Sequence, residues 1–466
     1  MKFKILFSIS FWALLFAVSC KSDEITFDNP SKELRFSKDT LFLDTIYNQV
    51  RSETYAVKVY NKEDKDVKIP RIALQGGSAS PYRINVDGKA GTEFIDVPLR
   101  KKDSLFIFVE IAPVANAKEA IAEDQIVFDN NLGQQKVTLL SVVQDAEFFI
   151  QSSNNPNILN SNTVWNSNKA KIIYGDLTVA EGKTLEIQEG TKVYFTKNAS
   201  LKISKNAKLN VNGSLNKEVL FRGDRNDTRY DTIPLNWKGI SFDEGAVLNM
   251  NYAKVFGGDT GIELHKSIAT IQNTIIHSFQ NYGILSINSD LKAQNLVMNS
   301  NGQASLGIFK GGTVDLTHCT LANYWDLNSS MPAYSLYATN EYTNKTGVVE
   351  QGALSLNIKN SIIYGDKDSS IFFKPTSGQT FNYTINSSLI KYSNKSGFDF
   401  DGNPWIVNSI KNEEPKFLTS YISKMNLRVN AESPAKGKAN AIFTNQVPKD
   451  IVGNTRTATP TIGAYQ

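Results

Sequence analysis

Apolar and polar residues alternate along most of this chain, and Asn, Gly, Ser and Asp interrupt the apolar positions at short intervals. A period of two is typical of β-strands, whereas the period of an amphipathic helix is almost absent. The pattern therefore predicts an all-β protein. The apolar runs are longer over residues 31–150 than over residues 151–410, which predicts two different β architectures in one chain.

The first block, residues 31–150, contains about seven extended runs, which is typical of an immunoglobulin-like β-sandwich. Two of them, Gln125–Phe128 and Val137–Val143, are separated by Asp129–Gly133, which has the turn chemistry that a hairpin requires. Because the Cys…Trp…Cys pattern of immunoglobulin domains is absent, the expectation concerns the architecture alone. In this interpretation the block is a spacer that precedes the second domain.

The second block, residues 151–410, is an internal repeat. Its tetrapeptides lie 21, 22, 23, 42 and 26 residues apart and begin at Tyr252, Asn273, Asn295, His318, Asn360 and Asn386. A period near 22 residues predicts one coil of three short strands, so the interval of 42 residues corresponds to about two coils. The block is therefore expected to be a right-handed parallel β-helix, with residues 411–466 as its C-terminal cap.

Each tetrapeptide has one predicted role for each position. The second and fourth residues face the interior, because strand side chains alternate between the two faces of a sheet. The fourth residues are expected to stack from coil to coil: Val255, Ile276, Met298, Leu321, Ile363 and Leu389. The first residue occupies a corner, where Asn is suitable because it tolerates left-handed backbone and can bond to the next Asn along the axis.

Three segments resemble the repeats of pectin-lyase-like surface proteins of the Bacteroidota. They are Tyr174–Phe221, then Phe221–Arg225 followed by Asn236–Ile240, and the ending Asp450–Gly453 with Ile462–Tyr465. The resemblance extends over roughly residues 160–466 and implies a parallel β-helix. It implies little about function, because this fold occurs in lyases, hydrolases, adhesins and inert scaffolds.

Residues 1–19 have the features of a lipoprotein signal peptide. Two lysines precede the apolar run Ile5–Val18, which is too short to span a bilayer comfortably. The run ends in Ala17–Cys20, which resembles the lipobox that lipoprotein signal peptidase cuts, although that family prefers Leu at the first of these positions. The resemblance implies that Cys20 is lipidated, with palmitate among its acyl chains, and an ordinary secretory signal is the alternative.

Residues 20–30 are then expected to form a tether. Within it, Lys21–Glu24 resembles the export signal of surface-exposed lipoproteins in the Bacteroidota. The resemblance implies a lipid-anchored protein of the outer membrane, exposed on the extracellular face.

Charge and cysteine content limit the possible partners of the protein and the interactions that stabilise its fold. The chain has 50 Lys and Arg residues and 46 Asp and Glu residues, spread throughout, which argues against a nucleic-acid partner. If Cys20 is acylated, Cys319 has no intramolecular partner, so the fold depends on core packing. No cofactor motif is present, and none is expected.

The sequence offers little for catalysis. The Asp-Asp, Gly-His-Gly and Arg-Ile-Lys motifs of polygalacturonases and the Trp-Ile-Asp-His motif of pectate lyases are absent. The densest acidic cluster is Asp224, Asp227 and Asp231, interleaved with three arginines, which favours a salt-bridged loop over a metal or catalytic site. His318 and Cys319 are adjacent, but Cys319 is interpreted as a small core residue.

Aromatic side chains are the remaining candidates for a binding site. Residues 324–352 interrupt the coil period and are rich in aromatic residues, which suggests a recognition insertion; the alternative is that these rings cover the side of the helix. The candidate ligand or partner contacts are Trp237, Tyr324, Trp325, Tyr334, Tyr337 and Tyr342.

Two function classes follow from these features. In the first, the protein is a non-catalytic scaffold that docks on an outer-membrane β-barrel complex for nutrient import or barrel assembly. In the second, it binds or cleaves an acidic polysaccharide, as other proteins of this fold do.

Overall fold

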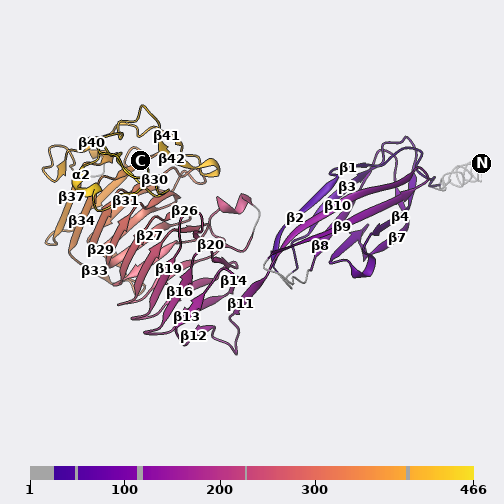
Figure 1. The fold of residues 1–466 in the computed structure, drawn as a ribbon, viewed down its shortest axis with the longest axis horizontal. Helices are drawn as coiled ribbons and strands as arrows, with labels where there is room; N and C mark the ends of the chain where they lie inside the picture. The colour runs from indigo at the N-terminus through magenta and orange to yellow at the C-terminus, as the bar shows by residue number, and fades with distance from the viewer. Residues whose placement is uncertain (1–25, 48–50, 113–118, 226–227, 395–398) are drawn as a thin grey trace, which may run out of the picture. The chain divides into compact units, whose positions relative to one another are not determined.

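A computed structural model describes residues 26–47, 51–112, 119–225, 228–394 and 399–466. The chain divides into two compact units between Val143 and Gln144, and both consist mainly of β-strands (Figure 1). The predicted lipidation site Cys20 and the acidic residue Asp227 lie outside the described residues.

The N-terminal unit is a β-sandwich of two five-stranded sheets, with strand orders β1-β3-β8-β5-β6 and β2-β10-β9-β4-β7. The strands are β1 (Arg35–Phe36), β2 (Thr40–Tyr47), β3 (Tyr55–Tyr60), β4 (Val67–Leu74), β5 (Tyr82–Val86), β6 (Lys89–Gly91), β7 (Glu93–Leu99), β8 (Ser104–Ile111), β9 (Glu119–Asn130) and β10 (Gly133–Gln144). Alternate residues such as Val57 and Ile107 of one sheet and Ile69 and Phe128 of the other are buried between the sheets. The predicted hairpin is confirmed as β9 and β10.

The boundary between the units differs from the expected one at residues 150 and 151. Strand β11 (Ala146–Ile150) pairs in parallel with β14 (Ala170–Tyr174), so it belongs to the second unit. Its composition is as apolar as that of a sandwich strand. Only the pairing partner distinguishes the two assignments.

The second unit is a parallel β-helix, as predicted, made of an 11-stranded sheet and a 17-stranded sheet. The further strands of the 11-stranded sheet are β17 (Lys192–Phe195), β20 (Val219–Gly223), β23 (Ala253–Phe256), β26 (Ile275–Phe279), β28 (Val297–Asn301), β30 (Thr320–Asn323), β35 (Ile362–Gly365), β38 (Leu389–Ile390) and β40 (Ile410–Lys411). Each of these strands pairs with its counterpart in the next coil. Successive coils thus extend the sheet along one axis (Figure 1).

The 17-stranded sheet receives two strand segments from most coils and bends around the other faces of the helix. Its strands are β12 (Ile158–Leu159), β13 (Thr163–Trp165), β15 (Asp176–Val179), β16 (Thr184–Gln188), β18 (Ser200–Ile203), β19 (Lys208–Asn212), β21 (Gly239–Phe242), β22 (Val247–Asn251), β24 (Ile262–His265), β25 (Ile268–Gln272), β27 (Tyr282–Gln294), β29 (Ala304–Thr317), β31 (Tyr334–Thr339), β34 (Leu354–Lys359), β36 (Ile371–Lys374), β37 (Phe381–Asn386) and β39 (Ile406–Val407). One continuous core from Trp165 to Phe400 lies inside the coils.

The predicted interior stack is confirmed for most of its length. Val255 pairs with Ile276, Ile276 with Met298, Met298 with Leu321 and Leu321 with Ile363, and all five side chains are buried.

The last step of the stack is wrong by one residue. Ile390 pairs with Ile363, and Leu389 pairs with Ile362. The backbone explains the shift, because the corner residue with positive φ is Ser387 (φ 48°) rather than Asn386.

The corners adopt left-handed backbone, as their sequence predicts. Tyr252, Asn273, Asn295, His318 and Asn360 have φ values of 47°, 47°, 50°, 53° and 48°. The amides also bond along the axis: Asn273 Nδ2 donates to Asn251 Oδ1 and Asn295 Nδ2 donates to Asn273 Oδ1, each at 2.9 Å. Such ladders satisfy polar groups that burial would otherwise leave unpaired.

The interval of 42 residues is one enlarged coil, not two. Strand β30 pairs directly with β35, so no complete coil lies between them. The additional length is taken up by a loop at residues 324–333 and by a hairpin of β32 (Glu341–Thr343) and β33 (Val349–Gln351). Between these insertions, β31 is a regular coil strand that pairs with β29 and β36.

Residues 412–466 pack along the outer face of the 11-stranded sheet instead of capping the last coil. This C-terminal segment contains β41 (Phe417–Thr419), β42 (Asn426–Val429) and the short helix α2 (Ala441–Thr444). Its Leu427, Ile451 and Ala464 bury Val297 and Ala322, which lie on the outward side of their strands. The end of the helix core is covered instead by Tyr392 and Phe400, with ring centroids 4.8 Å apart.

Candidate functional site

Six half-buried aromatic rings lie together on the outer side of the 17-stranded sheet. Tyr337 is placed there by the register, since its neighbours in adjacent coils are Gly307 and Phe372. Gly307 has no side chain, and a Cβ there would lie 2.8 Å from the Tyr282 ring, so that ring covers the gap. We call this group the aromatic face; it consists of Tyr282, Phe309, Tyr334, Tyr337, Tyr342 and Phe372.

The rings of the aromatic face stack mainly on one another. Phe309 and Tyr337 are stacked with centroids 5.0 Å apart, and Tyr337 and Phe372 with centroids 5.5 Å apart and planes within 3°. Burial raises the pKa of Tyr282 to about 12, so its phenol stays protonated and can donate a hydrogen bond. Phe309, Tyr337 and Phe372 therefore cover part of one another's ring faces, while Tyr282 and Tyr342 meet Phe309 at steep angles.

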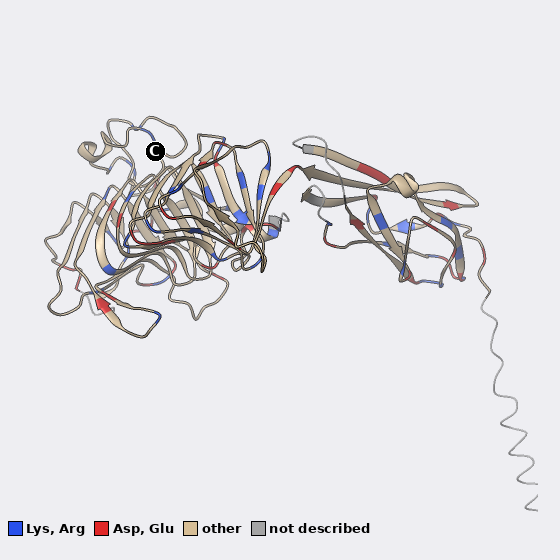
Figure 2. Cartoon of the chain, turned by 90° about the horizontal axis from the view of Figure 1, so that it is seen from below, with Lys and Arg blue, Asp and Glu red and all other residues tan. Residues whose placement is uncertain are grey.

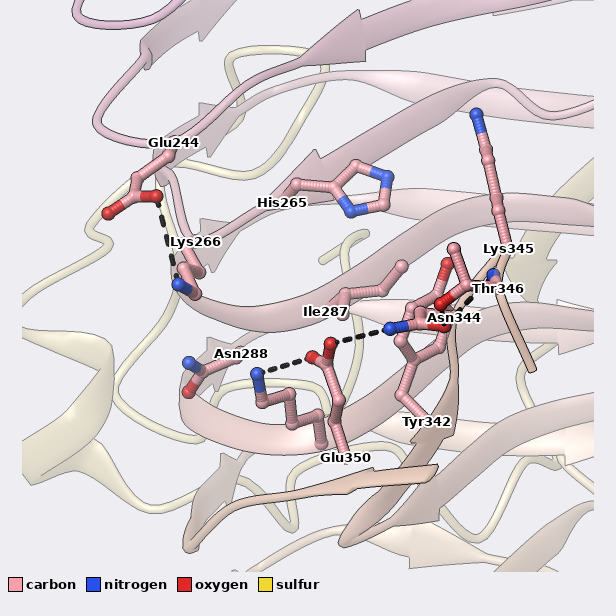
Figure 3. Close-up of a pocket in the computed structure, with 11 residues that line it drawn as sticks. Glu244, His265, Lys266, Ile287, Asn288, Tyr342, Asn344, Lys345, Thr346 and Glu350 are labelled. Carbon is pink, nitrogen blue, oxygen red and sulfur yellow. Dashed lines mark hydrogen bonds and ion pairs between the residues drawn. The ribbon is translucent and has the colours of Figure 1, made fainter. Parts of the chain in front are cut away.

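Beside the aromatic face, the hairpin β32–β33 overhangs the turns of four successive coils and borders an open pocket of about 400 Å³ (Figure 3). The turns contribute charged and polar side chains, and the hairpin supplies the opposite wall. The residues of this hairpin pocket are Glu244, His265, Lys266, Ile287, Asn288, Lys310, Tyr342, Asn344, Lys345, Thr346 and Glu350.

Ion pairs hold the hairpin against the coils. Lys310 Nζ lies 2.6 Å from Glu350 Oε2, and Asn344 Nδ2 donates to Glu350 Oε1 at 2.9 Å. The hydrogen bond from Lys310 and then that from Asn344 lower the pKa of Glu350. Figure 3 shows Lys345 extending away from this group, and within the described chain it makes no ion pair. The pocket therefore has compensated charges at its base and an ammonium at its rim.

Tyr342 joins the pocket to the aromatic face. Its ring meets His265 edge to face at 6.3 Å and Phe309 at 6.4 Å. His265 Nε2 lies 2.6 Å from Glu263 Oε1, and this hydrogen bond lowers the pKa of Glu263. The aromatic face and the hairpin pocket thus form one continuous surface, which we call the contact surface.

Ion pairs also lie on the outer side of the rest of the β-helix. Basic and acidic residues are interspersed over its outer side (Figure 2). Several pair between coils, such as Lys202 with Asp176 at 2.6 Å and Lys359 with Asp315 at 2.6 Å. Charge on this surface is therefore mixed in sign.

Three of the aromatic residues singled out in the sequence lie away from the contact surface. Trp237 is 1% exposed, stacks on Phe195 at 4.1 Å and donates from Nε1 to Phe256 O, so it is a core residue. Trp325 is 3% exposed and donates to Asn328 O. Tyr324 packs against Phe417 of the C-terminal segment, and burial raises the pKa of its phenol.

The other three, Tyr334, Tyr337 and Tyr342, come together on the contact surface. Sequence reasoning missed Tyr282, Phe309, Phe372 and His265, which complete it. The alignment of these residues with Tyr334 and Tyr337 depends on which strands pair between coils. The sequence does not show that pairing, because the loop at residues 324–333 and the hairpin β32–β33 interrupt the repeat of about 22 residues.

The acidic loop is at least partly neutralised. Arg222 Nη1 lies 2.5 Å from Asp231 Oδ1, and the Arg225 guanidinium lies 4.8 Å over the Tyr230 ring. Among the described residues, no group of three or more His, Cys, Asp or Glu side chains is arranged to hold a metal ion. Burial raises the pKa of Tyr174, and the negative charge of nearby Asp224 raises it further.

Cys319 is fully buried, and burial raises the pKa of its thiol to about 12. A thiol in this state is not a nucleophile at neutral pH. The neighbouring His318 is also buried, and its Nδ1 faces Gly463 O at 3.2 Å. Both side chains therefore act in packing.

In the part of the chain that the structure describes, no helix is long and apolar enough to cross a membrane.

No family model and no curated protein matches this chain. Among solved structures, the ASH/PapD-like domain of human CEP192 is 14% identical over 28% of this chain and 96% of its own, with a TM-score of 0.18. A family 123 glycoside hydrolase from Clostridium perfringens is 9% identical over 29% of this chain and 30% of its own, with a TM-score of 0.19. The VesB protease of Vibrio cholerae is 13% identical over 24% of this chain and 32% of its own, with a TM-score of 0.16.

Proposed function

We propose that this protein is a non-catalytic surface lipoprotein of the Bacteroidota type, anchored in the outer membrane through Cys20. Its β-helix serves as a rigid scaffold that docks on a protein partner. The partner is an outer-membrane β-barrel complex for nutrient import or barrel assembly.

The contact surface is the observation that supports docking. Protein interfaces combine an aromatic centre with a polar rim. Here half-buried rings centred on Tyr337 lie beside the ion pair of Lys310 and Glu350, with Lys345 at the edge. The rings are held by stacked coils, so little side-chain entropy remains to be lost on binding.

The protonation states of Glu350 and Glu263 do not supply the two carboxyl groups that polysaccharide cleavage requires. A glycosidase needs one protonated and one ionised carboxyl group on either side of the scissile bond. The hydrogen bonds of Glu350 with Lys310 and of Glu263 with His265 lower the pKa of both carboxyl groups. Both are therefore ionised at neutral pH, and this pair lacks the acid.

Removing residues 341–351 tests the proposal. The chain ends left by this deletion already meet, since Gly352 N donates to Asn340 O at 3.0 Å and Asn340 Nδ2 donates to Gly352 O at 2.7 Å. We expect the shortened protein to fold, because β31 and β34 remain, but to recover at least about tenfold less of a β-barrel partner. The measurement is cross-linking in cells, then purification from detergent-solubilised membranes and mass spectrometry.

A matched control is Tyr421→Ala, which truncates a 74% exposed aromatic residue outside the contact surface. It should recover the partner as the wild type does. A second variant, Tyr337→Ser, should weaken recovery while the hairpin stays in place. Equal recovery by the shortened protein, or the absence of any integral β-barrel protein from the wild-type sample, would contradict the proposal.

A further inference from the structure

A second pocket lies on another part of the 17-stranded sheet, over its last coils. It has a volume of about 460 Å³, within the range of roughly 300–1,000 Å³ that is usual for small-ligand sites. We call it the Trp405 groove. It is lined by Ser355, Leu356, Asn357, Pro375, Phe381, Asn382, Tyr383, Thr384, Asn403 and Trp405.

Trp405 is the most distinctive residue of the groove, because its side chain is 57% exposed. Single exposed aromatic residues are common on protein surfaces, and Tyr421 is more exposed still; Trp405 differs because its exposed ring lines a pocket together with polar side chains. Its position is defined by the backbone: Trp405 N donates to Asn403 Oδ1 at 3.0 Å, and Ile385 N donates to Trp405 O at 2.9 Å. The backbone of Trp405 is therefore fixed beside the last strands of the sheet, and its side chain starts from this fixed point.

Amide and hydroxyl groups form the floor beside the indole. Ser355 pairs with Asn382, and Asn357 with Thr384, on the outward side of β34 and β37. Thr384 Oγ1 donates to Asn357 Oδ1 at 2.8 Å, which leaves the Asn357 amide nitrogen directed elsewhere. Within the described residues, the side chains of Ser355 and Asn382 make no hydrogen bond, so their donors and acceptors are available to a ligand.

Charge separates this groove from the hairpin pocket. None of the ten residues that line it is charged, whereas the hairpin pocket contains lysine and glutamate side chains. An exposed indole ring with neutral hydrogen-bond donors and acceptors beside it fits a ligand that has apolar C–H faces and many hydroxyl groups. We propose that the Trp405 groove binds a segment of an uncharged oligosaccharide, with one sugar ring stacked on Trp405.

This site does not depend on partner docking, since none of its residues belongs to the contact surface. The test is titration calorimetry of the full-length protein in detergent with cello-, xylo-, manno- and malto-oligosaccharides. Oligogalacturonate serves as the charged comparison. At least one neutral series should bind, and Trp405→Ala should weaken its binding by about tenfold or more at an unchanged melting temperature.

Two further variants make the result unambiguous. Tyr421→Ala, another exposed aromatic residue, and the variant without residues 341–351 should both bind the oligosaccharide as the wild type does. If Trp405→Ala lowers the melting temperature, Asn382→Leu decides instead, because its exposed amide supports no hydrogen bond in the described chain. Weaker binding by that variant supports the site. The inference is overturned if no neutral oligosaccharide binds, if only oligogalacturonate binds, or if neither substitution weakens binding.

Discussion

Single residues at the corners of the coils have two structural roles: they adopt left-handed backbone, and their side chains bond to the C-terminal segment. Asn360 adopts left-handed backbone. Its side-chain amide also donates from Nδ2 to Asn440 O at 2.9 Å and accepts at Oδ1 from Asn440 N at 2.7 Å. His318 takes the same backbone conformation and contacts Thr444 Oγ1 at 2.9 Å. Asn295 accepts a bond from Arg456 Nη2 at 2.8 Å. The corner ladder therefore also attaches the C-terminal segment.

His318 makes this attachment sensitive to pH. Burial, with Arg456 nearby, lowers the pKa of His318 from 6.5 to about 3 in the folded protein. Below pH 6.5 the unfolded chain takes up a proton that the folded protein does not, so stability falls as the pH decreases from 6.5 towards 3. The loss is about 1.4 kcal/mol per pH unit for one histidine.

The comparison that isolates this effect is wild type against His318→Gln, with the free energy of unfolding measured by denaturant titration between pH 7 and pH 4. We expect the variant to lose less stability than the wild type over this interval. His277, whose pKa is lowered to about 4 by burial, remains in both proteins and serves as an internal constant. Parallel pH profiles would show that His318 does not set the slope.

At the scale of strands, the coil faces differ in what covers them. The outward residues of the 11-stranded sheet include Val297, Thr320 and Ile362, and these are buried by the C-terminal segment. The outward residues of the 17-stranded sheet remain accessible and include the contact surface and the Trp405 groove. Alternation alone therefore does not say which side of a strand meets solvent.

A pair of substitutions tests the register of the core. Ile276 is fully buried between Val255 and Met298, so Ile276→Asp places an unpaired charge in the core. We expect it to cost about 3–5 kcal/mol or to prevent cooperative unfolding. Thr270→Asp, at an outward position beside Lys292, should leave the melting temperature within a few degrees of the wild type.

Ile275 is not a suitable outward control, although the alternation of the tetrapeptide places it on that side. It packs against the cluster of Val297, Leu427 and Ile451, so Ile275→Asp should also destabilise the protein. Thermal melts in which Thr270→Asp is more harmful than Ile276→Asp would contradict the register.

At the scale of the whole molecule, the proposed scaffold combines the expected tether with two β units. A β-sandwich follows the predicted tether, and a β-helix with two separate candidate surfaces follows the sandwich. A lipid anchor would hold these surfaces at a membrane without any spanning helix.

The anchor itself gives the prediction at this scale. Because Cys20 follows a short apolar run and a lipobox-like tripeptide, Cys20→Ala should remain an unlipidated precursor or appear as a soluble form. Metabolic labelling with an alkyne fatty acid measures the difference. The wild type should carry label in the membrane fraction, whereas equal labelling of Cys20→Ala would contradict a lipidated Cys20.

The fold class could be predicted from the sequence because its causes are local. Alternation reports a strand, the repeat near 22 residues reports a coil, and a corner Asn reports left-handed backbone, each within a short window. Most of the interior stack, from Val255 to Ile363, follows from these signals. The acidic loop could also be read as salt-bridged, since its arginines and aspartates are close in sequence.

Only the tertiary structure decided the rest, because it depends on which distant residues meet. The two insertions around β31 made one coil look like two in the sequence, so the alignment of Tyr337 with Gly307 and Phe372 became visible only with the strand pairing. The burial of Val297 by Leu427 joins segments far apart in the chain. No local pattern distinguishes a Trp that fills a core, such as Trp237, from one that lies open, such as Trp405, since that difference lies in the neighbours each one acquires on folding.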